Sequence, residues 1–117
     1  MPVLVKRVYD EPAPGDGFRV LVDRLWPRGL TKERAALDGW LKDVAPSAGL
    51  RSWFHREGDF AAFADRYVTE LAANPALAEL RELVAGHPVV TLLYGAKADP
   101  EHNHAAVLRG VLAGGQT

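Results

Sequence analysis

Two arginines and a tryptophan recur at every second position after an apolar stretch. Arg24, Trp26 and Arg28 are separated by one residue each, and an extended backbone would place all three side chains on one side. Guanidinium groups bind carboxylates and phosphates through paired hydrogen bonds, and an indole offers a stacking face. The spacing therefore predicts an anion clamp. In the alternative interpretation, the arginines pair with nearby acids such as Asp23 while Trp26 packs in the core.

A second candidate site follows the apolar run that ends at Tyr94. A glycine-containing loop with Lys97 leads to a helix that opens near His102, Asn103 and His104. Free amides at a helix start attract anions, Lys97 adds a positive charge, and a histidine can donate a hydrogen bond or move a proton near neutral pH. We expect Tyr94 to be a wall, Lys97 and Asn103 to bind ligand, and His102 or His104 to be the acid–base candidate.

The second segment also has a purely structural interpretation. Asp99 or Glu101 can cap the helix while both histidines are solvated or bonded to the backbone. A metal site is not predicted, because His102 and His104 would diverge by about 200° on a regular helix. The sequence also has no H-E-x-x-H pattern and no cysteine.

Nucleic-acid binding is the alternative class of function. Arg24, Arg28, Lys32 and Arg34 can form a local basic surface, but acids such as Glu33 dilute it. The net charge is −1 and no nucleic-acid motif is present. We therefore rank a small anionic ligand above nucleic acid as the partner.

Composition indicates one folded domain. A chain of 117 residues with 48% hydrophobic and 25% charged residues can bury a core. The absence of cysteine excludes disulfides, thiol nucleophiles and iron–sulfur clusters. Neither serine, Ser47 or Ser52, lies in a G-x-S-x-G turn. No signal sequence or membrane span is evident, so we expect a cytoplasmic protein without membrane association, and no cofactor is implied.

Three apolar runs predict the strands that position the two segments. They cover residues 3–8, 18–24 and 88–94, and the second and third are nearly continuous, as in strands covered on both faces. Proline and glycine predict an irregular loop at 10–17. Residues 40–44 are too short and irregular to assign beyond a turn or short strand.

Helical spacing and capping residues predict the remaining elements. Thr31, Ser47 and Asp59 can each cap a helix, and Pro75 suits a first helical turn. The predicted helices are 32–37, a turn with Leu50, Trp53 and Phe54, a longer helix with Phe60, Phe63, Tyr67 and Leu71, a stretch from Pro75 to Gly86, and 102–113.

These elements predict an α/β fold, a single small domain with a mostly parallel sheet of three to four strands and helices packed over it. Ligands in such sheets bind beyond the carboxyl ends of the strands. The segments after residues 23 and 94 lie there.

Four blocks of the sequence together resemble a known family. They are RVLVDRLWPRGL at 19–30, WLKDVAPS at 40–47 with Leu50-Arg51 and Trp53-Phe54, LLY at 92–94, and EHNHA at 101–105. These blocks, which span nearly the whole chain, are similar to the YeaO-like branch of the DUF488 family, where DUF means domain of unknown function.

The resemblance implies a small bacterial α/β protein whose biochemical role is not established for the family. In other branches of the family, the terminal segment looks like a Cys-His-Arg motif where this chain has Asn103-His104-Ala105. Thiol chemistry inferred from those relatives therefore cannot be assigned to this chain. The blocks coincide with both candidate segments and add Lys42, which we place near the pocket. We expect a pocket for a carboxylate- or phosphate-bearing ligand, and an enzyme and a binding module remain equally compatible with it.

Overall fold

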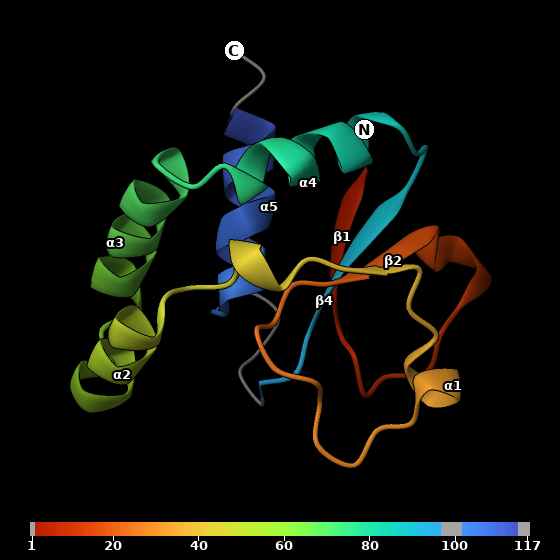
Figure 1. Cartoon of the computed structure of the whole chain (residues 1–117), viewed down its shortest axis with the longest axis horizontal. Helices are drawn as coiled ribbons and strands as arrows, with labels where there is room; N and C mark the ends of the chain where they lie inside the picture. Colours follow the sequence, from red (N-terminus) through yellow and green to blue (C-terminus); the bar gives the residue numbers. More distant parts are fainter. Residues whose placement is uncertain (1, 97–101, 115–117) are drawn as a thin grey trace.

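Four parallel strands among the described residues form one sheet, with most of the helices to one side of it in Figure 1. The computed structural model describes residues 2–96 and 102–114. The strands are β1 (Val3–Arg7), β2 (Phe18–Leu21), β3 (Gly39–Trp40) and β4 (Val90–Tyr94), in the order β1-β4-β2-β3. Every pairing is parallel. The predicted parallel α/β fold is confirmed, and the two most apolar strands are the central ones.

The central strands β2 and β4 end where the carboxylate of Asp23 takes the place of a backbone carbonyl as hydrogen-bond acceptor. The Val22 amide still donates to the Leu93 carbonyl at 3.0 Å, but the next amide, that of Gly95, donates to the Asp23 carboxylate at 2.8 Å. The strand predicted to reach residue 24 therefore stops at Leu21. The short strand expected within residues 40–44 is β3, which is only two residues long.

In the described part of the chain, five α-helices accompany the sheet: α1 (Lys32–Ala35), α2 (Ala48–Glu57), α3 (Phe60–Ala72), α4 (Ala76–Ala85) and α5 (His104–Gly114). Side chains of Thr31, Ser47 and Asp59 accept the predicted capping hydrogen bonds. Helix α1 ends two residues early because Ala36 adopts a left-handed conformation with φ 49°. Short 3₁₀ turns occupy Pro14–Asp16, inside the loop predicted to be irregular, and Lys42–Val44.

The two faces of the sheet are covered differently. Val20 and Leu92 face the larger core, to which helices α2 to α5 contribute. Leu21 and Leu93, the next residues along the same strands, face a smaller core with Ala35 of α1. Neighbouring residues of a strand point to opposite faces. This is why continuous apolar runs were needed in β2 and β4.

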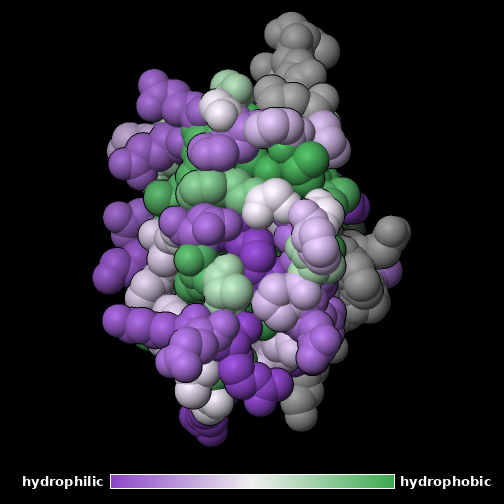
Figure 2. All heavy atoms as spheres, turned by 90° about the vertical axis from the view of Figure 1, so that its right-hand side faces the viewer, coloured by the Kyte–Doolittle hydropathy of each residue, from purple (hydrophilic) through white to green (hydrophobic). Residues whose placement is uncertain are grey.

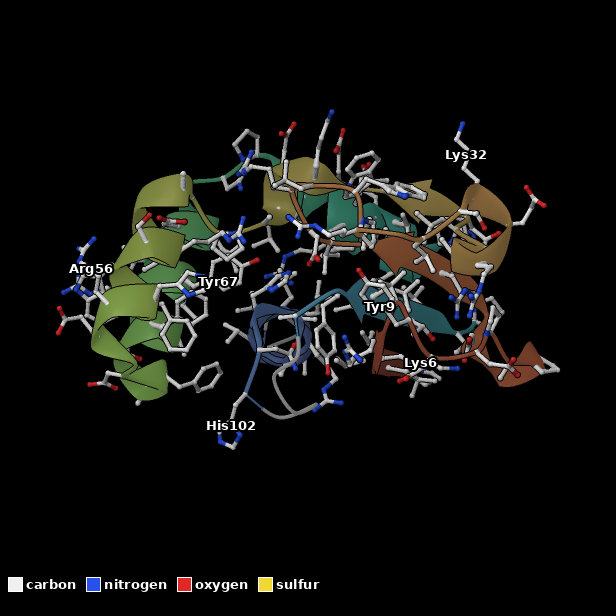
Figure 3. The ribbon with its side chains drawn as sticks, turned by 90° about the horizontal axis from the view of Figure 1, so that it is seen from below. Lys6, Tyr9, Lys32, Arg56, Tyr67 and His102 are labelled. Atoms are coloured by element: carbon white, nitrogen blue, oxygen red, sulfur yellow. The ribbon has the colours of Figure 1, made fainter. Side chains whose placement is uncertain are left out.

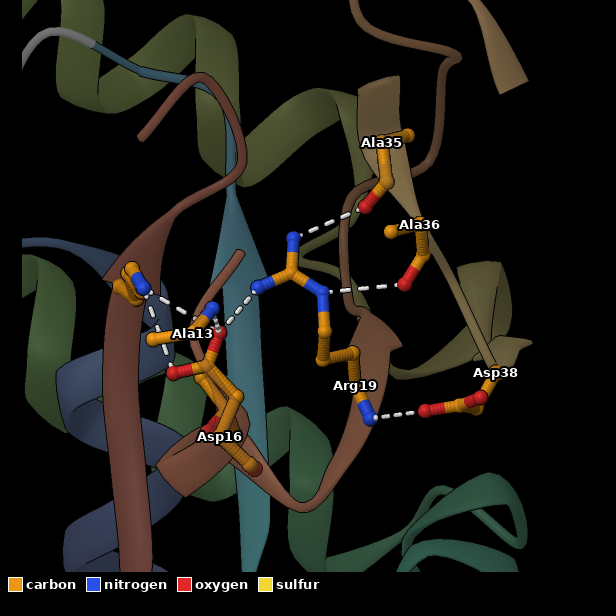
Figure 4. A network of polar contacts seen from close by, with 8 residues as sticks. Ala13, Asp16, Arg19, Ala35, Ala36 and Asp38 are labelled. Carbon is orange, nitrogen blue, oxygen red and sulfur yellow. Dashed lines mark hydrogen bonds and ion pairs between the residues drawn. The ribbon is translucent and has the colours of Figure 1, made fainter. Parts of the chain in front are cut away.

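A buried polar network joins the smaller-core side of β2 to its neighbours (Figure 4). The guanidinium of Arg19, 4% exposed, pairs with Asp16 and donates to the carbonyls of Ala35 and Ala36 at 2.8 and 3.0 Å. Lys6 also pairs with Asp16, at 3.2 Å. This network, which we call the Arg19 network, anchors the turn before β2 and the end of α1.

Asp16 is held in its charged form by this network. Burial alone would raise the pKa of its carboxyl, but hydrogen bonds from the Ala13 amide, Lys6 and Arg19 outweigh burial and hold the pKa below its usual value. The Asp16 carbonyl also accepts the hydroxyl of Thr91 at 2.7 Å. The sequence analysis did not single out these residues.

The molecular surface near α1 is mixed. Figure 2 shows hydrophilic side chains alternating with apolar patches over the side of the molecule that lies at the right of Figure 1. In the part of the chain that the structure describes, no helix has both the length and the apolar character needed to cross a bilayer.

Candidate functional site

A cleft of about 360 Å³ opens at the carboxyl edge of the sheet. Tyr9, Asp23 and Gly95, which follow β1, β2 and β4, contribute to its lining. One wall is the loop 24–28, and α2 supplies another. Parallel sheets bind ligands at this edge. The segments predicted from strand topology therefore meet at one cleft.

Asp23 connects four elements at the base of this cleft. Its Oδ2 accepts the Gly95 amide at 2.8 Å after β4, and its carbonyl accepts the indole N–H of Trp40 from β3 at 2.7 Å. Its Oδ1 lies 3.0 Å from Nε2 of His104 at the start of α5. A Cβ on residue 95 would come within 2.9 Å of Oδ2, so glycine is required for this approach.

The imidazole of His104 is held in one orientation. Its Nε2 is hydrogen-bonded to the Val22 carbonyl at 3.1 Å and faces the Asp23 carboxylate. Both neighbours are acceptors, so Nε2 carries hydrogen whether the ring is neutral or charged. The side chains of His104 and Asp23 are 14% and 20% exposed. A half-buried, oriented imidazole therefore lines the cleft.

His102 and Asn103 have different surroundings. His102 is exposed and projects outward in Figure 3. Its ring lies edge-on to that of Phe60, with centroids 5.2 Å apart. Asn103 is buried, and its Oδ1 accepts the Ala106 amide at 3.0 Å, which makes it the cap of α5. The helix consequently begins at His104 rather than at the predicted residue 102. Both residues contribute to the cleft lining.

Arg24, Trp26 and Arg28 all line the cleft, as the clamp hypothesis requires. Leu25 and Pro27 line it too, because the segment is a loop with bends and turns rather than an extended strand. The alternation that motivated the prediction is thus absent, although its three residues meet in one place.

The arginines of this loop have weak partners. Arg24 reaches the Ala45 carbonyl at 3.4 Å and Asp43 at 4.0 Å, and the Asp43 side chain is 80% exposed. Surface pairs of this kind contribute little. The guanidinium of Arg28, an exposed residue, has no hydrogen bond or ion pair with a described residue.

Trp26 combines both interpretations offered by the sequence. Its indole N–H donates to the Leu30 carbonyl at 2.7 Å, and its ring lies edge-on to Trp40 with centroids 5.6 Å apart. It also packs against the smaller core while lining the cleft. Trp26 is therefore a packed wall residue.

Other predicted residues lie away from the cleft. Lys42 is exposed, with its ammonium 5.3 Å from the centroid of the Trp40 ring, and Tyr94 is fully buried in the larger core. Neither contributes to the described lining. Lys97 lies outside the described residues. Lys32 and Arg34 of the nucleic-acid hypothesis are exposed on α1, and Lys32 points outward in Figure 3.

The contribution of α2 to the cleft is not among the sequence predictions. Arg51, Phe54 and His55 line the cleft, and their spacing of three and four residues places them on one helical face. That spacing was a usable signal. Arg51 is exposed, and its guanidinium has no hydrogen bond or ion pair with any residue in the described ranges. Arg56, one residue beyond His55, projects from the outer side of the helix (Figure 3).

Residues of α3 and the turn after it position the start of α2. Ser47 Oγ accepts the Leu50 amide at 3.1 Å and donates to Glu70, which also accepts the Ser47 amide at 3.0 Å. Asn74 donates to the Asp43 carbonyl at 2.8 Å. These bonds fix the chain between β3 and α2, and so fix the α2 wall.

Tyr67 of α3 also holds the chain between β3 and α2 in place. Its hydroxyl donates to the Val44 carbonyl inside the protein. Burial raises the pKa of Tyr67 well above its usual value, and the nearby carboxylates of Glu70 and Asp23 raise it further. The phenol therefore remains protonated and retains this hydrogen bond.

Most of the charged side chains in the described lining are positive. Arg24, Arg28 and Arg51 line the cleft together with one described carboxylate, that of Asp23, which already contacts the Gly95 amide and His104. Guanidinium groups with spare donors suit a carboxylate or phosphate. Within residues 2–96 and 102–114, no group of three or more His, Cys, Asp or Glu side chains is arranged to hold a metal ion.

Comparison with known proteins gives a consistent family assignment. Residues 2–115 match a family model described as the inactive DUF488-N3 subclade. The chain is 48% identical over 113 residues to an uncharacterized protein of Mycobacterium tuberculosis, covering 96% of this chain and 94% of the relative. It is 46% identical over 109 residues to the uncharacterized protein YeaO of Escherichia coli, covering 92% and 94%. No solved structure gives a significant match.

Proposed function

This chain belongs to the DUF488 family, as its sequence blocks indicated, and we propose that its function lies in the cleft and is the binding of a small anion. The anion carries a carboxylate or phosphate group. The observation that supports this most directly is that three arginines, from the loop 24–28 and from α2, line one cleft in which Asp23 is the one carboxylate among the described lining residues.

The proposal rests on the unused hydrogen-bonding capacity of these arginines. Arg28 and Arg51 have no guanidinium partner among the described residues, and Arg24 has only long contacts. Each guanidinium can donate two parallel hydrogen bonds to one carboxylate or phosphate. An anion between the loop 24–28 and α2 would contact both walls.

Binding without chemistry is the form of the proposal that we favour over catalysis. The family model that matches the chain is described as an inactive subclade. The oriented imidazole of His104 then serves as a ligand contact at the base of the cleft rather than as an acid–base catalyst.

Calorimetric titration with carboxylates and phosphates at fixed ionic strength tests this function. Arg51→Gln is expected to weaken binding by about tenfold, because it removes a charged donor from the α2 wall. Arg56→Gln is the matched control, since Arg56 is an exposed arginine on the same helix outside the described lining. Wild-type affinity in the Arg56 variant is expected.

Equal losses in the two variants would point to a general charge effect and against a site in the cleft. Circular dichroism of both variants verifies that they are folded. Failure of the wild-type protein to bind any tested anion would refute the proposed function.

A further inference from the structure

The cleft is larger than a bare inorganic anion requires. Its volume of about 360 Å³ falls at the lower end of the range of pockets for organic ligands, roughly 300–1,000 Å³. An occupant that fills it must include atoms beyond the charged group.

Exposed cations and buried aromatic rings both line this cleft. Arg28 and Arg51 are exposed and stand at its rim. Phe54 is half-buried and Phe63 is 3% exposed, and their rings stack at a centroid distance of 4.6 Å with a tilt of 30°. The lining therefore combines exposed cations with aromatic carbon surfaces that are continuous with the larger core.

The Asp23 carboxylate opposes binding of an anionic group deep in the cleft. Asp23 is 20% exposed, and its charge is less screened there than at the rim. It repels a second negative charge placed at depth. A bound anion is thus favoured at the rim, with its uncharged part directed inward.

We propose that the natural ligand is an organic anion with a flat apolar body, such as an aromatic ring. Its carboxylate or phosphate group lies between Arg28 and Arg51, and its body packs against Phe54 and Phe63. This inference rests on the proposed anion-binding function and specifies the class of ligand.

Two matched pairs of probes test the inference by calorimetry: acetate against benzoate, and inorganic phosphate against phenyl phosphate. The aromatic member of each pair is expected to bind at least about tenfold more tightly, because its ring leaves water for an apolar surface. Equal affinities within both pairs would overturn the inference while leaving the anion site intact. If none of the four probes binds, both proposals fail.

A conservative substitution tests where the aromatic ring of the ligand binds. Phe54→Leu is expected to reduce the benzoate-to-acetate affinity ratio by about threefold to tenfold while leaving acetate affinity unchanged, because it removes a flat surface and no charge. Phe60→Leu is the control, since Phe60 neighbours Phe54 but lies outside the described lining. An unchanged ratio in Phe54→Leu, or the same reduction in Phe60→Leu, would rule out the proposed seat for the ring.

Discussion

Arg19 and Arg51 show two different uses of the same side chain. Arg19 is almost fully buried and donates to Asp16 and to two carbonyls at the end of α1. Arg51 is exposed in the cleft and has no guanidinium partner among the described residues. A buried arginine satisfied by its own chain stabilises the fold, whereas one with free donors beside a cleft can bind a ligand.

The carboxylate of the Arg19 network, Asp16, and that of the cleft, Asp23, also differ in their hydrogen-bond partners. Asp16 accepts hydrogen bonds from Lys6, Arg19 and the Ala13 amide. Asp23 has different partners among the described residues: Oδ2 accepts the Gly95 amide, and Oδ1 lies 3.0 Å from His104 Nε2, which is also hydrogen-bonded to the Val22 carbonyl. No described arginine or lysine pairs with this carboxylate, which distinguishes the cleft from the Arg19 network.

The largest effect is expected from breaking the Arg19 network. Arg19→Met removes one partner of a buried ion pair and leaves the carbonyls of Ala35 and Ala36 without their donors. We expect the free energy of unfolding in urea to fall by about 3 kcal/mol or more. Arg51→Gln should change it by less than about 0.5 kcal/mol. Similar losses in the two variants would remove the distinction between the regions.

Acid should weaken the same network by a smaller amount. Because the folded pKa of Asp16 lies below its usual value of 3.8, its contribution is complete above pH 3.8 and is lost as pH falls from there through the lower folded value. Urea unfolding at several acidic pH values should show a steeper fall for the wild type than for Asp16→Asn. Asp43→Asn, which alters an exposed carboxylate, should retain the wild-type slope.

The smallest stability effect is expected at the base of the cleft. Gly95→Ala forces the new Cβ against Asp23 Oδ2 and disturbs one hydrogen bond, at a cost of about 1 kcal/mol in urea unfolding. The displaced carboxylate should also weaken benzoate binding. Gly49→Ala, in a helix where the added methyl meets nothing within 4 Å, should instead be neutral or stabilising. A Gly95 variant as stable as wild type would show that this approach is not required.

Local chemistry made most elements of the fold predictable. Continuous apolar runs identified β2 and β4 as central, and Thr31, Ser47 and Asp59 cap helices as expected. The two-residue strand β3 carries too few residues for any periodicity. It is held by partners distant in sequence, because the Leu41 amide donates to the Leu21 carbonyl.

The candidate site was only partly predictable, because strand ends locate a cleft without showing which side chains face it. Tyr94 ends β4 but points into the larger core, and Lys42 stands over Trp40 instead of entering the cleft. Arg51 is not among the predicted site residues, although its spacing from Phe54 and His55 places all three on one face of α2, which lines the cleft. Arg19 resembles an ordinary strand residue until the distant carbonyls of α1 are brought to it.

The strand order also has a consequence for synthesis of the protein on the ribosome. β4 lies between β1 and β2, yet it is the last strand to be made. Until Val90 has emerged, β1 and β2 lack the neighbour that joins them, and both present unpaired edges. The sheet therefore closes late, and a nascent chain that pauses before β4 is the species most exposed to aggregation or chaperone capture.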